Sequence, residues 1–167
     1  MRLFAVVTMA VAALPVRIPD VRAAGEAVDR MAEFRQLVGG TWSCVTQAPI
    51  LGAAPVHREH STAVFEMLSS ISGDVLHDHI VSQDYSGDFY IGYSDRLGEY
   101  WMTGADSLGT DISLTSKDGS HYDGTSSMGG ITMNDSATYQ NFADRTVGHE
   151  VFRRPGVLAI FDTICTR

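Results

Sequence analysis

The positions of the only two cysteines constrain the fold of this 167-residue chain more than any other feature. Cys44 lies two residues after Trp42, where a β-rich region of the sequence begins, and Cys165 lies where that region ends. Both cysteines belong to short runs that are typical of β-strands. The first and last strands of a closed barrel are neighbours, so closure of a barrel would bring these two thiols together.

The N-terminal residues predict export. Arg2 precedes an apolar run over residues 3–14, and Ala23 ends a short segment of the kind that a signal peptidase cleaves. We therefore expect a signal peptide over residues 1–23 and a periplasmic or extracellular protein. The alternative is a membrane anchor, which the shortness of the apolar run disfavours.

Export bears on the state of the cysteines. Two cysteines in an exported chain most simply pair, so we expect a disulfide between Cys44 and Cys165, with two buried free thiols as the alternative. The pair would join positions 121 residues apart. A closed loop of that size stabilises a fold by about 4–5 kcal/mol in the chain-entropy model.

Size and charge narrow the class of protein. Residues 24–167 are enough for one domain with one core. Loss of residues 1–23 removes three of the 12 basic and one of the 20 acidic side chains, which leaves nine basic and nineteen acidic ones. This acidic balance argues against nucleic acid and anionic membranes as partners. We also expect no stable membrane span, because no second long apolar run follows.

One segment has clear helical periodicity. Met31, Phe34 and Leu37 recur at helical spacing within residues 27–38, and a Gly-Gly pair at 39–40 stops the pattern. We expect a helix over residues 27–38 that covers one end of the β-domain.

The remainder of the chain alternates short β-rich runs with Gly-rich turns. A meander of about ten strands normally closes or splits, so we predict an antiparallel up-and-down barrel, with a β-sandwich as the alternative. The predicted strands cover residues 41–47, 58–68, 75–83, 88–94, 99–105, 111–116, 121–125, 131–140, 146–153 and 157–166. A longer loop is expected over residues 51–56.

Several motifs resemble one family. Residues 34–42 (FRQLVGGTW) resemble the helix-then-Gly-x-Trp start of the calycin superfamily of lipocalin-like barrels. The rhythm of residues 88–95, 98–101 and 106–109, followed by the Asp-Gly turn at 118–119, is similar to bacterial lipocalin-like proteins of the DUF1579 type. The resemblance implies a barrel with a ligand-sized interior and no defined reaction.

The resemblance also implies roles for particular residues. Lipocalin-like barrels often stack an arginine over the Gly-x-Trp tryptophan, here Trp42, and Arg145, Arg153 or Arg154 could take that place. The related nitrobindin-like barrels hold haem through a late histidine, and His149 has a comparable position in this sequence. Its neighbours do not match that motif, so no cofactor is predicted, and haem remains an alternative.

The sequence His77-Asp78-His79 offers a second candidate chemistry. Residues i and i+2 of a strand share a face, so His77 and His79 could hold a divalent metal with a third ligand from a neighbouring strand. The candidates for that third ligand are His57, His60, His121 and Glu66. Hydrated surface histidines are the alternative.

Aromatic and methionine residues give the clearest indication of function. Small barrels either fill their interior or hold one small ligand. We expect an exported protein that binds a small hydrophobic or amphipathic molecule and is not an enzyme. One alternative is an isomerase, cyclase or hydrolase that uses His77, Asp78 and His79, and another is a filled-core structural or partner-binding envelope protein. The interior candidates are Trp42, Phe89, Ile91, Tyr93, Tyr100 and Met102.

Overall fold

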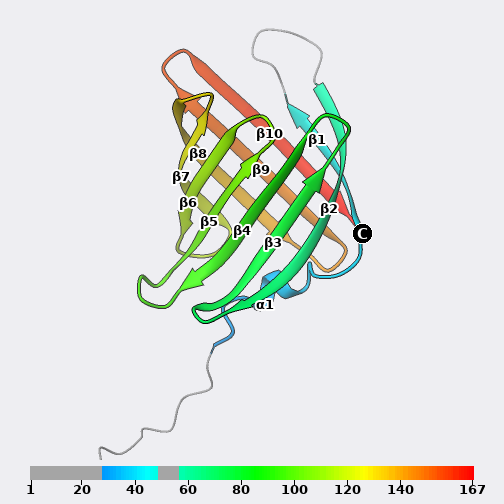
Figure 1. Cartoon of the computed structure of the whole chain (residues 1–167), viewed down its shortest axis with the longest axis vertical. Coiled ribbons are helices and arrows are strands. Elements are labelled where there is room, and N and C mark those ends of the chain that lie inside the picture. The colour runs from blue at the N-terminus through cyan, green and yellow to red at the C-terminus, as the bar shows by residue number, and fades with distance from the viewer. Residues whose placement is uncertain (1–27, 49–56) are drawn as a thin grey trace, which may run out of the picture.

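A computed structural model describes residues 28–48 and 57–167 and shows a closed antiparallel β-barrel (Figure 1). Each strand pairs with its neighbours in chain order, and β1 pairs with β10 to close the barrel. This confirms the predicted up-and-down barrel and excludes a sandwich. The elements are α1 (Ala32–Arg35), β1 (Trp42–Ala48), β2 (His57–Ser70), β3 (Gly73–Val81), β4 (Ser86–Ser94), β5 (Glu99–Asp106), β6 (Thr110–Ser116), β7 (His121–Met128), β8 (Ile131–Asn141), β9 (Arg145–Arg154) and β10 (Val157–Thr166).

The strands obey the two-residue period of β-structure. In β6, Thr110, Ile112 and Leu114 are buried, and the residues between them are exposed. Inward positions therefore alternate with outward ones along each strand. This alternation decides which side chains face the barrel interior.

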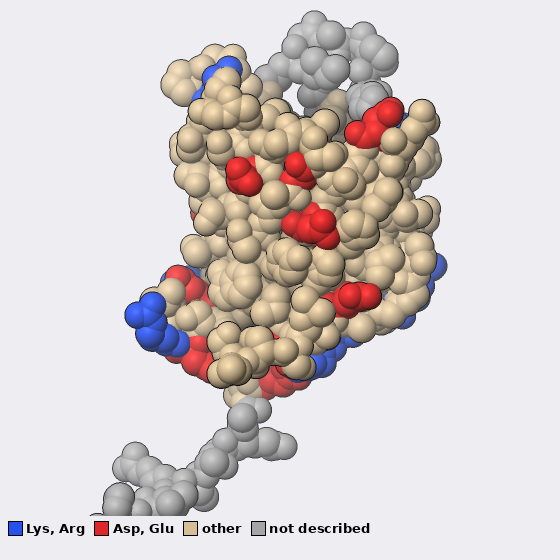
Figure 2. Space-filling model, in the orientation of Figure 1, with Lys and Arg blue, Asp and Glu red and all other residues tan. Residues whose placement is uncertain are grey.

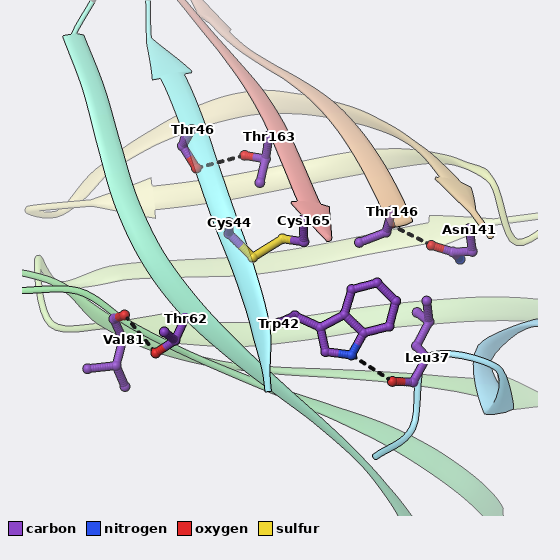
Figure 3. Close-up of a disulfide and its surroundings, with 10 residues drawn as sticks. All are labelled: Leu37, Trp42, Cys44, Thr46, Thr62, Val81, Asn141, Thr146, Thr163 and Cys165. Atoms are coloured by element: carbon purple, nitrogen blue, oxygen red, sulfur yellow. Dashed lines mark hydrogen bonds between the residues drawn. A yellow bond between two sulfur atoms is a disulfide. The ribbon is translucent and has the colours of Figure 1, made fainter. Parts of the chain in front are cut away.

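The predicted disulfide is present between β1 and β10 (Figure 3). Cys44 lies directly opposite Cys165 in the register of these strands, and both are buried. Two positions further along the same inward face, the hydroxyls of Thr46 and Thr163 are hydrogen-bonded at 2.9 Å. The bridge therefore fastens the seam at which the barrel closes.

The helix is much shorter than the sequence predicted. Only Ala32–Arg35 is α-helical, whereas the expectation ran over residues 27–38, the first of which lies outside the described residues. Flanking carbonyls accept hydrogen bonds from barrel side chains in place of helical N–H groups. The Tyr100 hydroxyl donates to the Arg30 carbonyl at 2.9 Å, and the Trp42 indole donates to the Leu37 carbonyl at 3.0 Å. Apolar spacing over the segment reflects docking onto the barrel end, where Met31, Phe34 and Leu37 are buried.

An arginine does stack on Trp42, but it is not one of the three that were predicted. The guanidinium carbon of Arg167 lies 4.8 Å from the ring centroid of Trp42. The same guanidinium donates to the carbonyls of Leu37 and Val38, both at 3.1 Å. The predicted arginines lie elsewhere: Arg145 stacks on Phe142, and Arg153 donates to the hydroxyl of Ser136.

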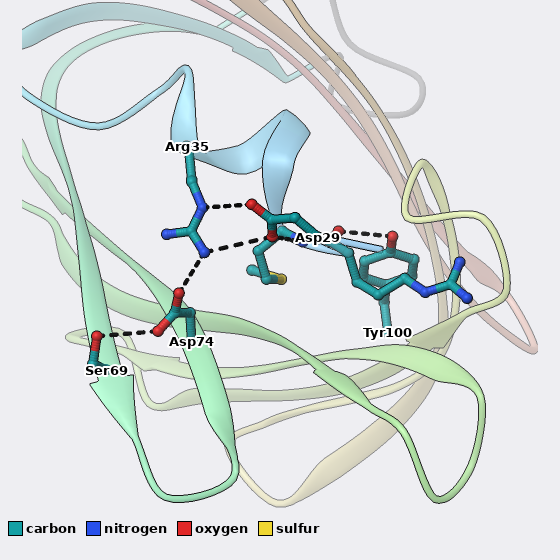
Figure 4. A network of polar contacts seen from close by, with 7 residues as sticks. Asp29, Arg35, Ser69, Asp74 and Tyr100 are labelled. Atoms are coloured by element: carbon teal, nitrogen blue, oxygen red, sulfur yellow. Dashed lines mark hydrogen bonds and ion pairs between the residues drawn. The ribbon is translucent and has the colours of Figure 1, made fainter. Parts of the chain in front are cut away.

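A polar network links the α1 segment to the β2–β3 hairpin (Figure 4). Arg35 pairs with Asp29 at 2.9 Å and also with Asp74 of β3, which accepts a hydrogen bond from Ser69. These groups are largely exposed, and exposed ion pairs contribute little to stability. We regard the network as orienting the segment, while burial of its apolar side chains holds it in place.

Two predictions lie outside the described residues. They are the signal peptide over residues 1–23 and the loop over residues 51–56. No helix in residues 28–48 and 57–167 is long and apolar enough to cross a membrane.

Candidate functional site

The barrel encloses a cavity of about 280 Å³. This lies near the small end of the range of roughly 300–1,000 Å³ that is usual for ligand pockets. Phe34 and Leu37 line it from the α1 segment and close one end. Asp106, Leu108 and Thr110, around the β5–β6 hairpin, line it at the other end.

Most of the cavity wall is apolar. Phe89 and Ile91 of β4 face inward beside Met102 of β5. Phe89 lies against Gly104, where an added Cβ would collide with its ring and with the Asp88 carbonyl. The missing side chain therefore gives the ring its place on the wall. Further apolar lining comes from Leu76, Ile80, Ile112, Phe152 and Phe161.

Carboxylates interrupt this apolar wall. Glu59, Asp78, Asp106 and Glu150 line the cavity from four different strands. Among the described lining residues there is no Lys, Arg or His. The acidic groups inside the barrel therefore have no cationic side chain beside them in the described wall.

Asp78 is the most isolated of these acids. It faces inward from β3 between Leu76 and Ile80, and burial, with a smaller effect of the Asp88 charge, raises its pKa to about 8. Its Oδ1 atom is buried and has no hydrogen-bond partner in the described part of the chain. A buried polar atom without a partner costs free energy, so this position favours a bound group that supplies a hydrogen.

Asp135 and Glu150 form a second buried acidic group. Ser126 donates a hydrogen bond to one oxygen of Asp135, and the carboxyl of Glu150 lies within hydrogen-bond reach of Asp135. Burial raises the pKa of both carboxyls, and the charge of Asp135 further raises the pKa of Glu150. Burial also raises the pKa of the neighbouring Tyr139 well above its usual value. The cavity thus disfavours negative charge on its own wall.

The predicted interior residues separate into two groups. Phe89, Ile91 and Met102 line the cavity. Trp42 is fully buried between Phe65 and Arg167, under the closed end. Tyr93 and Tyr100 make an edge-to-face contact with ring centroids 4.9 Å apart, and both pack against the residues of the α1 segment. These three aromatic residues thus support the floor and are not among the described lining residues.

His77 and His79 meet on the outer face of the barrel. The Nε2 of His77 and the Nδ1 of His79 each lie 2.8 Å from the same oxygen of Asp88 on β4. Both hydrogen bonds lower the pKa of Asp88. Asp78, between the two histidines in sequence, faces the opposite side of the wall. The alternative enzyme hypothesis needs all three residues in one site, and the strand alternation separates them.

The late histidine is also on the outside. His149 of β9 is exposed, and its Nδ1 lies 2.6 Å from Asp162 of β10. Its sequence neighbours Gly148 and Glu150 line the cavity. An internal haem would find no axial ligand at His149, because this side chain points away from the interior.

The interior acids were missed in the sequence, although a signal was present. Asp78 shares its strand face with Leu76 and Ile80, and Glu150 shares its face with Gly148 and Phe152. An acid in phase with apolar residues indicates an inward carboxylate. The enzyme hypothesis grouped Asp78 with the adjacent histidines, whose side chains lie on the outer face.

Surface charge is unevenly distributed on the face seen in Figure 2. Most basic side chains of this face lie near the end that α1 covers, whereas acidic side chains lie both there and over the middle. The strands on this side include β3, β4 and β5 (Figure 1).

Comparisons with known proteins add little. No protein-family model matches the chain, and no curated protein matches it. The ywiB protein from Bacillus subtilis is structurally similar over 75% of this chain and 89% of its own, with 8% sequence identity and a TM-score of 0.26. A TM-score this low carries no argument about function. The fold and its cavity define a closed antiparallel barrel that is compatible with binding a ligand.

Proposed function

We propose that the protein binds one small amphipathic molecule inside its barrel, with the polar end of that molecule directed at the interior carboxylates. The observation that carries this proposal is an apolar cavity into which Asp78 presents a buried oxygen without a partner. The absence of Lys, Arg and His from the described lining adds to it. A ligand that donates hydrogen bonds or carries positive charge complements such a wall.

The apolar lining favours a short aliphatic or aromatic body for the ligand. Phe89, Ile91 and Met102 would contact that body, and methionine adapts easily to irregular shapes. A cavity of about 280 Å³ accepts a molecule of modest size and excludes a long acyl chain folded on itself. A small organic amine meets both requirements.

Calorimetric titration with octylamine and octanoate at pH 7 tests the proposal. The two probes share most of an alkyl chain and differ in the sign of charge at the polar end. We expect octylamine to bind and octanoate to bind at least tenfold more weakly. Asp78→Asn should weaken octylamine binding, because it removes the interior carboxyl that pairs with the amine. Asp111→Asn, the same substitution at an exposed outward position of β6, should leave octylamine binding unchanged.

Native mass spectrometry of protein from its natural source gives the second test. An organic mass that leaves on denaturation supports the proposal and identifies the class of ligand. A bare polypeptide mass, together with no heat of binding for either probe, overturns it and favours the filled-core or partner-binding alternative. Equal affinity for both probes overturns the role of the carboxylates while leaving a binding cavity.

A further inference from the structure

A cluster of three metal-ligating side chains lies on the outer face of the barrel, separate from the cavity. It consists of His77 and His79 from β3 and Asp88 from β4. One possible ligand atom from each residue lies within 4.8 Å of the other two. The two imidazole nitrogens already converge on one carboxylate oxygen, each at 2.8 Å.

The sheet positions this cluster before any ion arrives. His77 and His79 share the outward face of β3 because they are two residues apart. Asp88 lies directly opposite His79 in the β3–β4 register, and Tyr90 lies opposite His77. The rings of Tyr90 and His77 are stacked with centroids 4.7 Å apart and an angle of 8° between planes. Stacking and strand pairing therefore restrict the donors to a narrow range of positions.

The donor set indicates the class of ion. Two imidazole nitrogens and one carboxylate oxygen suit zinc and other late first-row divalent metals, whereas magnesium and calcium prefer sites made entirely of oxygen. The side chains of His79 and Asp88 are 44% and 50% exposed, and that of His77 is 19% exposed. Solvent can therefore complete the coordination of a bound ion on the outer side.

The surroundings are compatible with a cation. On β2, Glu66 lies opposite His77 and Val64 lies opposite His79. On β5, Ala105 lies opposite Asp88. None of these register neighbours is basic, and Glu66 adds negative charge on the same side of the sheet. Its carboxylate is not part of the converging group, although the sequence singled it out as a candidate ligand.

We propose that His77, His79 and Asp88 form a binding site for one divalent transition-metal ion of the zinc type. The site is independent of the proposed ligand cavity, because its side chains lie on the other side of the barrel wall. The ion would replace the two hydrogen bonds to Asp88 with three coordinate bonds and would fasten β3 to β4.

Calorimetric titration of chelator-treated, tag-free protein with Zn²⁺ and Mg²⁺ at pH 7.5 tests the site. We expect one Zn²⁺ per chain, no measurable binding of Mg²⁺, and a rise in Tm with added Zn²⁺, since an ion that binds only the folded state stabilises it. His77→Ala and His79→Ala should each lower the affinity for Zn²⁺ at least tenfold. Asp88→Asn should lower this affinity less than either histidine variant. Each side chain is on the barrel surface, so circular dichroism should show an unchanged fold.

His149→Ala is the matched control. His149 is also an outward histidine whose ring nitrogen lies close to an aspartate. Among the described residues, however, this pair is not part of a group of three potential metal ligands. This variant should keep both the affinity and the stoichiometry of Zn²⁺, and Glu66→Gln should leave the affinity within threefold. Absence of Zn²⁺ binding overturns the proposal, as does binding that survives in the His77→Ala/His79→Ala double variant.

Discussion

Arg167 covers the indole of Trp42, with its guanidinium carbon 4.8 Å from the ring centroid. The guanidinium group also donates hydrogen bonds to the carbonyls of Leu37 and Val38, which follow α1. Arg167, the residue after β10, therefore contacts both β1 and the α1 segment. It links the closed end of the barrel to the seam between the first and last strands.

Arg167→Ala should lower the free energy of unfolding by about 2 kcal/mol, because it removes a cation–π contact and several hydrogen bonds. Arg167→Lys should recover less than half of this loss, since an ammonium group lacks the planar fork of donors. Urea unfolding followed by tryptophan fluorescence measures both. Arg154→Ala is the control, and equal stability of Arg167→Ala and this control would contradict the assigned role.

Loss of the disulfide should cost more than loss of the arginine. Cys44 and Cys165 are 121 residues apart in sequence, so the bridge closes a long loop in the unfolded chain and lowers the conformational entropy of the unfolded state. We expect a Cys44→Ala/Cys165→Ala variant to be about 4 kcal/mol less stable than the oxidised protein, on the chain-entropy model. Unfolding of both proteins under identical conditions measures this difference. A loss below about 1 kcal/mol would mean that the other contacts at the seam suffice.

The free energy of unfolding should fall as the pH rises above the usual pKa of a glutamic acid side chain. Burial raises the pKa of Glu150 in the folded protein above its usual 4.5, so the folded state holds a proton that the unfolded state has released. The stabilising contribution of that proton is complete below about pH 4.5 and is lost as the pH rises through the folded-state pKa. The slope approaches at most about 1.4 kcal/mol per pH unit for one such group.

Glu150→Gln should flatten this dependence, because an amide holds its hydrogens at every pH. Urea unfolding at several values between pH 5 and pH 8 measures the slope for both proteins. Asp78 and Asp135 also have raised pKa values, so some slope should remain in the variant. Identical slopes in variant and wild type would contradict the burial of Glu150.

A larger side chain inside the cavity separates a hollow barrel from a filled one. Ile112 lines the cavity and is 7% exposed. In Ile112→Trp the added ring has space to enter, so we expect a loss of stability below about 1.5 kcal/mol, where a close-packed core would lose up to about 3 kcal/mol. Octylamine affinity should fall at least tenfold by calorimetry. Severe destabilisation with no change in binding would contradict the cavity.

The sequence by itself determined the approximate strands and the antiparallel meander, and it predicted closure with a sandwich as the alternative. Strand positions follow from a two-residue pattern and Gly-rich turns, which are local properties of the chain. The predicted disulfide between Cys44 and Cys165 is confirmed, because closure of the ten-stranded meander places the two residues opposite each other. The predicted helix was too long. Apolar spacing shows which residues are buried, but it does not show which backbone carbonyls accept hydrogen bonds from side chains of the barrel.

Tertiary structure alone decided which residues meet in the two candidate sites. Local pattern placed His77 and His79 together, but their partner Asp88 comes from register with the next strand. Local sequence pattern also could not identify Arg167 as the arginine that stacks on Trp42, because the two residues are far apart in sequence. Only the closed barrel shows which wall face is shut off from water, and that burial turns Asp78 from a surface acid into an interior carboxyl with a raised pKa.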